Sequence, residues 1–395
     1  MDYALLLLGV LGWAAGVLLF APAAYSAALL ALGGGPPAAD AAAAAGSPKV
    51  TLLISALRPS PGLDGTLRRA AAVDYADSEL LLALGSGDGE GAAIGAGLAR
   101  EPRVIVSDEP RGKAHTLNRA VREAKGEFVL MLDEDSLVEP GCVREMLPFA
   151  RGERVWAVVG EPYASNADSG VIQRTLGLEA SAWTRTARAR DRLGLFLPAT
   201  GFFALIDRGS LPEGGAWDEG ALAEDADLSL RQEAKGLRTR LSAAKVGIEA
   251  PASLGALSRQ RLRWYKGMFD ALWKNRGAVV RLPFRKALDA VMSLLAPLSP
   301  AGFVVLLLLA PVWPLALGPL LLGVLAVYLV SAWASASKLA RGRLGVVLFS
   351  VPYAVLQGAV ALAALSAFLL HVRVKWERTP KSGDAAQAPP RNAFT

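Results

Sequence analysis

The chain has 395 residues, of which 53% are hydrophobic, and its mean hydropathy of +0.34 is too high for a single soluble domain, so we expect a soluble part joined to membrane segments. A single cysteine, Cys142, excludes an intrachain disulfide framework, and two histidines exclude a histidine-rich metal site, so any bound metal is expected on oxygen ligands, as Mg²⁺ or Mn²⁺. The net charge of +6 suits anionic lipid or a phosphorylated substrate, and the scattered basic residues form no nucleic-acid-binding motif.

The first predicted element is a transmembrane helix within residues 1–33. Residues 4–32 carry no charge, and a membrane span needs about 20 apolar residues. A cleaved signal peptide is the alternative, but the apolar run is long for one and no basic residues precede it. Residues 34–47, rich in Gly, Pro and Ala, are predicted to be a linker.

Residues 48–281 have an ordinary, charged composition and are predicted to form one α/β domain. Strand-like and helix-like runs alternate there, which predicts a mostly parallel sheet flanked by helices. The expected strands are KVTLLISAL, SELLLALGS, PRVIVSD, EFVLMLD and VWAVVGE, and the expected helices include GLDGTLRRAAAVDY and GKAHTLNRAVREAKG. Ligands of such sheets bind beyond the carboxyl ends of the strands.

The remaining chain is again apolar. Residues 282–299 are interrupted by proline, which favours a helix along the membrane interface, and residues 300–372 are predicted to hold about three transmembrane helices before a polar tail at 373–395. Lys and Arg near both membrane edges of the large domain place that domain in the cytoplasm, in a multi-pass protein of the plasma membrane. Three spans leave the basic stretch HVRVKWERTPK outside, against the same rule, and an extra or missing span would resolve this.

Three acidic residues, Asp133, Glu134 and Asp135, end the apolar run FVLML. Like charges this close destabilise one another unless a cation or water separates them. Asp133 and Asp135 lie two residues apart across a strand end, where they could hold one Mg²⁺ or Mn²⁺ whose shell is completed by phosphate oxygens. A solvated acidic turn is the alternative.

A second acidic group, Glu224, Asp225 and Asp227, opens a predicted amphipathic helix, DADLSLRQEAKG. Carboxylates at a helix N-terminus are stabilised by the helix dipole, and this structural role explains much of the pattern. Near a sugar hydroxyl, a carboxylate there could equally act as a general base.

The stretch SRQRLRWYKG, residues 258–267, supplies an amide, a cation and a flat ring through Gln260, Arg263 and Trp264. Arginine binds diphosphate by paired hydrogen bonds, and tryptophan stacks on apolar sugar faces. A basic, aromatic helix that anchors the domain to lipid is the alternative.

Together these motifs resemble the membrane-integrated family 2 glycosyltransferases, the relatives of cellulose, chitin, hyaluronan and poly-N-acetylglucosamine synthases. Asp-x-Asp at a strand end is followed by Glu-Asp and then by Gln-x-x-Arg-Trp, all between membrane segments. The stretches RGKAHTLNRAV, ATGFFALIDR and KWERTP are further similarities. The resemblance covers about residues 48 to 280, and its Gln-x-x-Arg-Trp element is the most specific part.

The resemblance implies a GT-A fold and an inverting transfer from a nucleotide-sugar, with a UDP-sugar as the preferred donor. Asp133 and Asp135 would hold Mg²⁺ or Mn²⁺ on the donor diphosphate, with Lys113 near the nucleotide. Asp225 would be the base that takes the proton of the acceptor hydroxyl, with Glu224 beside it.

The resemblance also implies an acceptor site. Gln260 and Trp264 would line its far end, Arg263 would reach the donor diphosphate, and residues Thr200, Gly201 and Phe202 would shape the pocket. The acceptor would be a growing polysaccharide or a lipid-linked glycan, and the sugar a hexose or an N-acetylhexosamine.

The nucleotide pocket departs from the family pattern. The acid expected after the first strand is missing from ISALRPSPG, and Ala83 and Leu84 stand where paired acids would follow the second strand. Asp88 or Asp108 could substitute for them. Two alternatives therefore stay open: an enzyme that makes a single transfer to a lipid, similar to the ceramide glucosyltransferases, and a membrane protein that binds a nucleotide or glycan without catalysis.

Overall fold

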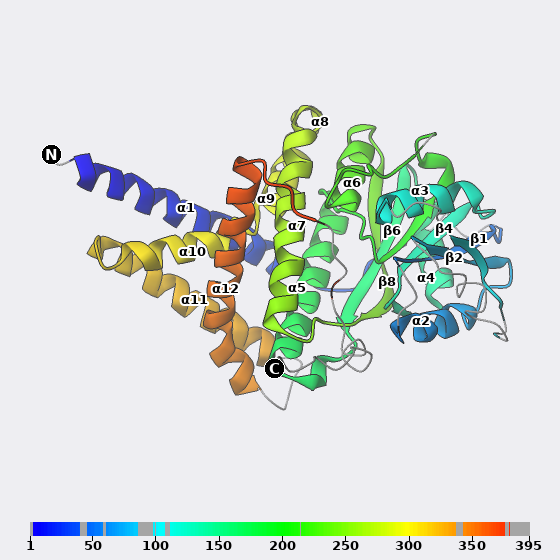
Figure 1. Ribbon diagram of the computed structural model, residues 1–395, viewed down its shortest axis with the longest axis horizontal. Helices are drawn as coiled ribbons and strands as arrows, with labels where there is room; N and C mark the ends of the chain where they lie inside the picture. The colour runs from blue at the N-terminus through cyan, green and yellow to red at the C-terminus, as the bar shows by residue number, and fades with distance from the viewer. Residues whose placement is uncertain are drawn as a thin grey trace, which may run out of the picture.

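The computed structural model describes residues 3–39, 46–57, 61–85, 98, 100–106, 111–213, 215–336, 343–375 and 379. An α/β domain occupies one side of the molecule, and a group of long apolar helices extends from its other side (Figure 1). Asp88, Asp108, most of the basic loop at 337–343 and nearly all of the polar tail lie outside the described residues.

Eight strands of the described residues form one mixed sheet in the order β3-β2-β1-β4-β7-β6-β8-β5. The strands are β1 (Val50–Ala56), β2 (Ser78–Leu84), β3 (Arg103–Val106), β4 (Phe128–Asp133), β5 (Leu137–Val138), β6 (Val155–Ala164), β7 (Phe203–Asp207) and β8 (Arg238–Ile248). Strands β3, β2, β1 and β4 run parallel, β7 runs antiparallel to β4 and β6, and β8 runs parallel to β6. This confirms the predicted mostly parallel sheet. Its strand β1 is buried over its whole length because both faces are covered.

Helices cover both faces of the sheet. On one face, Leu52 and Ile54 of β1 pack in a cluster with α2 (Pro61–Ala71) and α4 (Cys142–Ala150). On the other face, Leu53 packs in a second cluster that includes residues of α3 (Lys113–Glu123), α5 (Val171–Leu193) and α6 (Glu224–Ala234). Alternate residues of one strand point to opposite faces, so this two-sided core fixes the register of β1.

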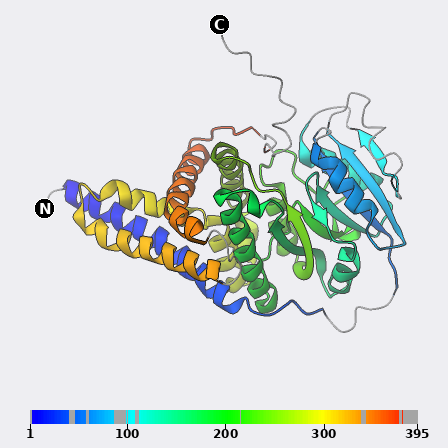
Figure 2. The same ribbon diagram turned by 90° about the horizontal axis from the view of Figure 1, so that it is seen from below.

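The apolar helices gather at one end of the molecule. They are α1 (Tyr3–Leu32), α10 (Leu298–Leu309), α11 (Leu317–Ala336) and α12 (Arg343–Leu369). Figure 2 shows α1, α10 and α11 side by side and directed away from the sheet, and α12 lies across them beside the domain in Figure 1. Gly302 allows α10 to approach α1 closely, since a Cβ at that position would lie 2.5 Å from the Ala15 carbonyl oxygen.

Two helices of the described residues are long and apolar enough to cross a membrane, at Leu7–Leu32 and Leu344–Leu369. A third membrane span is possible if α9 (Phe284–Leu295) and α10, which are bent by 52° relative to each other, form one broken span. The apolar stretch Pro314–Val327 is shorter than a span. The expected N-terminal span is thus matched by α1. About three spans are expected in the C-terminal part. One helix there, Leu344–Leu369, is both long and apolar enough to span a membrane by itself.

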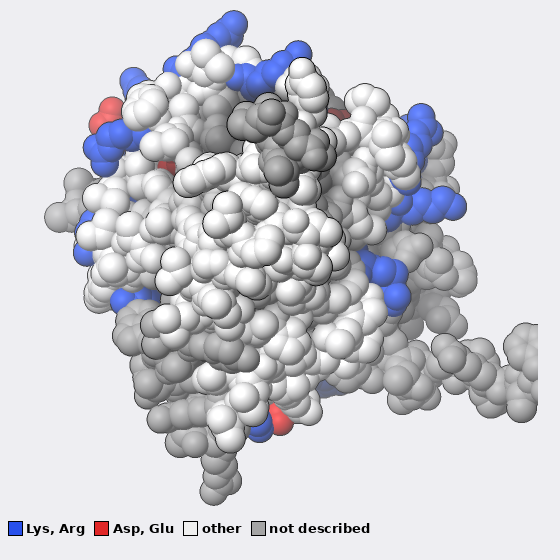
Figure 3. Space-filling model, turned by 90° about the vertical axis from the view of Figure 1, so that its left-hand side faces the viewer, with Lys and Arg blue, Asp and Glu red and all other residues white. Residues whose placement is uncertain are grey.

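The helical end of the molecule presents a largely uncharged surface with Lys and Arg at its margins (Figure 3). Leucines of α11 are exposed there, among them Leu321 at 65% and Leu322 at 60%. An exposed apolar surface of this extent is typical of a region covered by lipid or by a partner. Together with the length of α1 and α12, it indicates membrane association.

Arginines of α5 attach the domain to the C-terminal end of α1. The Arg185 guanidinium donates to the Leu30 carbonyl oxygen at 3.1 Å, and Arg192 donates to the Leu32 carbonyl oxygen at 2.7 Å. Cations are favoured at helix C-termini because the last carbonyl groups are unpaired and carry partial negative charge. The domain and the first apolar helix are therefore held in one arrangement.

Candidate active site

The acidic end of β4 lies against the first residue of α3. The Lys113 Nζ atom donates to Asp133 Oδ1 at 2.6 Å and to the Gly201 carbonyl oxygen at 3.2 Å. It also lies 3.8 Å from Glu224 Oε1. One ammonium group therefore joins the strand end, the loop before β7 and the beginning of α6.

Gly201 connects this lysine to Asp225. Its N–H donates to Asp225 Oδ2 at 3.1 Å, while the other carboxylate oxygen of Asp225 accepts from the Ala226 N–H at 2.8 Å. A Cβ at position 201 would lie 3.3 Å from Lys113 Nζ and 3.5 Å from Asp225 Oδ2. The absence of a side chain keeps the space between the two charged groups open.

The charges of the site act on one another. Burial raises the pKa of Glu224, which is 7% exposed, and Asp225 and Asp133 add to this rise against the opposing effect of Lys113. Burial alone would lower the pKa of Lys113, but the neighbouring carboxylates outweigh it and the pKa is raised. Burial lowers the pKa of Arg263, and the same three carboxylates oppose that change. Two cations and three carboxylates thus form one electrostatic unit.

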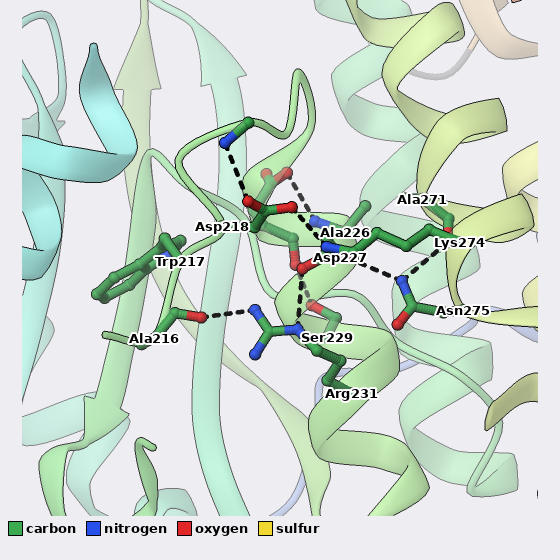
Figure 4. Close-up of polar contacts among 12 residues, drawn as sticks. Ala216, Trp217, Asp218, Ala226, Asp227, Ser229, Arg231, Ala271, Lys274 and Asn275 are labelled. Atoms are coloured by element: carbon green, nitrogen blue, oxygen red, sulfur yellow. Dashed lines mark hydrogen bonds and ion pairs between the residues drawn. The ribbon is translucent and has the colours of Figure 1, made fainter. Parts of the chain in front are cut away.

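Asp227, the third acid of the second group, holds α6 to the end of α7 (Leu254–Lys274), as Figure 4 shows. Its carboxylate is fully buried and contacts Lys274 Nζ at 2.9 Å, Asn275 Nδ2 at 2.9 Å and Arg231 Nε at 2.9 Å. Because Asp225 is on α6 and Arg263 is on α7, this contact fixes the two candidate residues relative to each other. A buried carboxylate with three donors is a structural anchor.

Gly267 sets the distance between α7 and the start of α6. A Cβ at this position would lie 2.8 Å from both the Cβ and the N atom of Ala223, the residue before Glu224. Contacts below 3 Å cannot be accommodated without moving one of the two elements. The close packing of α7, which carries Arg263, against the start of α6 therefore depends on a glycine.

Replacing Gly267 by Ala is expected to displace α7 from α6 and to lower any activity of this site about tenfold or more, because a small misplacement of a reacting group is costly. Thermal unfolding and initial rates of the purified variant would be compared with those of Gly277→Ala, where a Cβ meets nothing within 4 Å. Equal activity of the two variants would contradict the role assigned to Gly267.

The other predicted site residues lie nearby. Asp135 Oδ2 accepts from the Glu249 N–H at 3.3 Å, at the end of β8. Ser136 links the Asp133 N–H at 3.1 Å to the Phe202 carbonyl oxygen at 2.8 Å. The Thr200 hydroxyl donates to the Phe203 carbonyl oxygen at 3.1 Å and so shapes the turn. Phe202 itself is half-buried.

Gln260, Arg263 and Trp264 lie on α7. Arg263 and Trp264 follow Gln260 by three and four residues, so the three side chains share one face of the helix. Gln260 is half-buried. The Trp264 ring packs with a cluster that includes Phe269 of α7 and Leu298 of α10. Of the predicted site residues, Lys113, Asp133, Gly201, Glu224, Asp225 and Arg263 form the connected group. Trp264 lies at the junction with the apolar helices.

Two supporting residues were not predicted. Asn118 of α3 accepts from the N–H groups of Ala216 and Trp217 and donates to the Trp217 carbonyl oxygen at 2.8 Å, so it holds the loop that leads into α6. Gly267 is the second. Asn118 lies within RGKAHTLNRAV and Gly267 within SRQRLRWYKG, and these stretches are the only sequence signal for the two residues. Their roles could not be predicted because each residue contacts a segment far away in the chain.

The donor set fits a hard divalent cation. Asp133 and Asp135 offer only oxygen, and Asp133 already binds a cation, the Lys113 ammonium. Within the described ranges there is no group of three or more His, Cys, Asp or Glu side chains that could hold a metal. A cation bound at this point would therefore need further oxygen ligands, which a diphosphate supplies.

The carboxyl end of β2 carries no acidic side chain among the residues that the structure describes. Ala83 and Leu84 are fully buried. Ser55 pairs in register with Ala83 and Asp133, and its buried hydroxyl has no hydrogen-bond partner within the described residues. The sequence departure is therefore real for Ala83 and Leu84, whereas Asp88 and Asp108 lie outside the described residues.

The arrangement of the sheet defines the class of fold. A mannosyltransferase from Pyrobaculum calidifontis, solved in complex with GDP-Man and Mn²⁺, superposes with a TM-score of 0.61 at 17% identity, over 93% of this chain and 100% of that one. The fold is thus that of the GT-A glycosyltransferases, as predicted.

Residues 48–267 match the model of the glycosyltransferase-like family 2, and the chain belongs to this family. Poly-beta-1,6-N-acetyl-D-glucosamine synthases are similar: that of Staphylococcus aureus is 26% identical over 57% of this chain and 56% of the relative. That of Staphylococcus epidermidis is 24% identical over 59% and 57%. The match thus spans little more than half the length of these relatives.

Proposed function

We propose that the protein is an inverting glycosyltransferase that moves a sugar from a nucleotide-sugar to a growing polysaccharide or another membrane glycan. The observation that carries this proposal is the convergence of Lys113, Asp133, Glu224 and Asp225 at Gly201, together with the electrostatic effect of the same carboxylates on Arg263. These residues come from four separate segments of the chain. Such a group at the carboxyl ends of the strands suits a negatively charged donor.

In this proposal Asp225 is the general base. Its Oδ2 atom lies beside Gly201, where no side chain blocks an approaching hydroxyl. The carboxylate accepts the proton of the acceptor hydroxyl as the hydroxyl attacks the anomeric carbon and the diphosphate leaves. A single base and no enzyme nucleophile give inversion at that carbon. Burial raises the pKa of Glu224, the residue next to Asp225. Glu224 is not assigned the role of the base.

Lys113 and Arg263 bind the departing diphosphate and stabilise its developing charge. Asp133 and Asp135 would hold the divalent cation, Mg²⁺ or Mn²⁺. When bound, this cation neutralises negative charge on the donor diphosphate. Gln260, Trp264, Thr200 and Phe202 are assigned to the acceptor side.

The donor is proposed to be a UDP-sugar, and the sugar an N-acetylhexosamine or hexose. The similar synthases named above make poly-beta-1,6-N-acetyl-D-glucosamine, which supports a polysaccharide acceptor. Ala83 and Leu84 stand where the family pattern has acids, so donors with different nucleotides are compared in the experiment below.

We place the protein in the plasma membrane as a multi-pass protein with its catalytic domain in the cytoplasm. The arginines of α5 at the end of α1 support this side, because Lys and Arg concentrate on the cytoplasmic side of membrane helices. Lipid covers the uncharged end of the molecule in this arrangement.

The test uses the full chain in lipid nanodiscs with labelled UDP- and GDP-sugars, Mn²⁺ or Mg²⁺, and total membrane lipid. A ladder of long products supports polymer synthesis. One extractable glycolipid supports the single-transfer alternative. Metal-dependent nucleotide binding without transfer from any donor would favour the non-catalytic alternative.

A further inference from the structure

Polar side chains of α5, α7 and α12 meet where the domain contacts the apolar helices. Arg261 of α7 pairs with Glu179 of α5, and the Tyr353 hydroxyl of α12 donates to Glu179 Oε1 at 2.6 Å. One turn further along, the Tyr265 hydroxyl donates to the Gln357 side-chain oxygen of α12. We call these five residues, Glu179, Arg261, Tyr265, Tyr353 and Gln357, the α12 seam.

The tyrosines and the glutamine of the α12 seam are buried, although α12 is an apolar helix. Tyr353 is 8% exposed and Gln357 is 5% exposed. Polar groups are costly in an apolar environment unless they are hydrogen-bonded, so the bonds of Tyr353 and Gln357 specify one rotation and one depth of α12 against α7. The ring of Phe349 lies 5.9 Å from that of Tyr353 and belongs with it to the same apolar cluster.

Arg261 connects the α12 seam to the acceptor face of α7. Its guanidinium carbon lies 4.7 Å from the centroid of the Trp264 ring, which is three residues further along the helix. The Arg261 side chain is 14% exposed. In the sequence Arg261 directly follows Gln260 and precedes Arg263 by two residues. A side chain that is paired on one side and stacked on the other fixes both the plane of the indole ring and the rotation of α7.

We infer that Arg261 is a positioning residue for acceptor binding, held in place by Glu179 and Tyr353. This inference rests on the proposed function. The charged group around Gly201 binds the donor, whereas the α12 seam orients the face of α7 that carries Gln260 and Trp264 toward the acceptor. Most of the donor side lies outside the seam, because Lys113 and Asp133 are held by α3, β4 and the loop before β7. Of the proposed donor residues, Arg263 alone shares α7 with the seam.

The predicted signature is a split between acceptor and donor constants. Tyr353→Phe removes one hydroxyl and keeps the ring, and Glu179→Gln removes the charge and keeps the shape. Each is expected to raise the acceptor KM about tenfold, the effect of losing a hydrogen bond to a charged group. The dissociation constant of the nucleoside diphosphate with Mn²⁺ is expected to stay within about twofold. The double variant should resemble the single ones, since both act through Arg261.

Tyr25→Phe is the matched control. The Tyr25 hydroxyl of α1 also donates to a buried carboxylate, Asp289 Oδ1 at 2.7 Å, but Asp289 belongs to α9 and its other donor is Arg190, which is not part of the α12 seam. This variant is expected to keep the acceptor KM. Arg261→Lys should recover part of the loss seen with Arg261→Ala, since it keeps the charge but not the planar fork.

The measurement is made on the full chain in nanodiscs, with acceptor KM, kcat, nucleoside diphosphate binding and thermal unfolding recorded for each variant. An unchanged acceptor KM in Tyr353→Phe and Glu179→Gln overturns the inference, and so does an equal rise in Tyr25→Phe. Wild-type protein that transfers no sugar from any donor overturns the proposed function and this inference with it. Normal wild-type transfer with unaltered constants in the variants overturns the inference alone.

Discussion

Asp225→Asn is expected to lower kcat about 10²–10⁴-fold, the usual contribution of a general base. The amide cannot accept the acceptor proton, whereas Lys113, Asp133 and Arg263 still bind the diphosphate. The dissociation constant of the donor should therefore change little. Radiolabelled sugar transfer at saturating donor, together with calorimetric binding of the nucleoside diphosphate, measures the two quantities separately.

The control for this variant is Asp207→Asn. Asp207 also accepts a backbone N–H, that of Gly209 at 3.0 Å, but it lies at the opposite end of the sheet, because β7 runs antiparallel to β4 and pairs Asp207 with Phe128. This variant should retain activity. If Asp225→Asn kept the wild-type rate, Asp225 would be removed from the role of base.

Asp133→Asn is expected to abolish the effect of divalent cations on donor binding and to lower kcat/KM more than a hundredfold. A metal ligand contributes several kcal/mol to charge stabilisation, and each 1.36 kcal/mol is a factor of ten. The substitution also removes the negative charge that lies 2.6 Å from the Lys113 ammonium. Titration of nucleoside diphosphate binding with Mn²⁺, with and without a chelator, reads the effect directly.

Asp74→Asn serves as the comparison, since the Asp74 carboxylate also pairs with a cation, Arg144 Nη2 at 3.0 Å, on the exposed surface. Its donor binding should remain cation-dependent. Wild-type donor binding that a chelator does not weaken would contradict the assignment of Asp133 and Asp135 as metal ligands.

The strands that begin the sheet could be predicted because their signal is local. The runs that became β1, β2 and β4 are apolar on both faces and end at polar or glycine-rich turns, and the acids after β4 fall at the carboxyl end of its strand. The strand β7 (Phe203–Asp207) was not singled out. It is five residues long, and its antiparallel place between β4 and β6 depends on partners far away in the chain.

The candidate site residues could be proposed from the sequence, but the contacts among them could not. The spacing of Asp133, Asp135 and of Gln260, Arg263, Trp264 is visible in the sequence. That Lys113 joins Asp133 to Gly201, or that Asp227 faces α7 while Asp225 faces Gly201, is decided by three-dimensional packing. A helix of the length and composition of α12 predicts a membrane span, and only its packing shows that Tyr353 and Gln357 face α5 and α7.

The most direct test is the release of nucleoside diphosphate from a panel of nucleotide-sugars by the full chain in nanodiscs, with wild type and Asp225→Asn side by side. If the acids of β4 and α6 share one donor site, we expect the wild type to release nucleoside diphosphate from one sugar donor. This release should require a divalent ion and should be lost in Asp225→Asn. Release that is absent with every donor, or equal in both proteins, would contradict it.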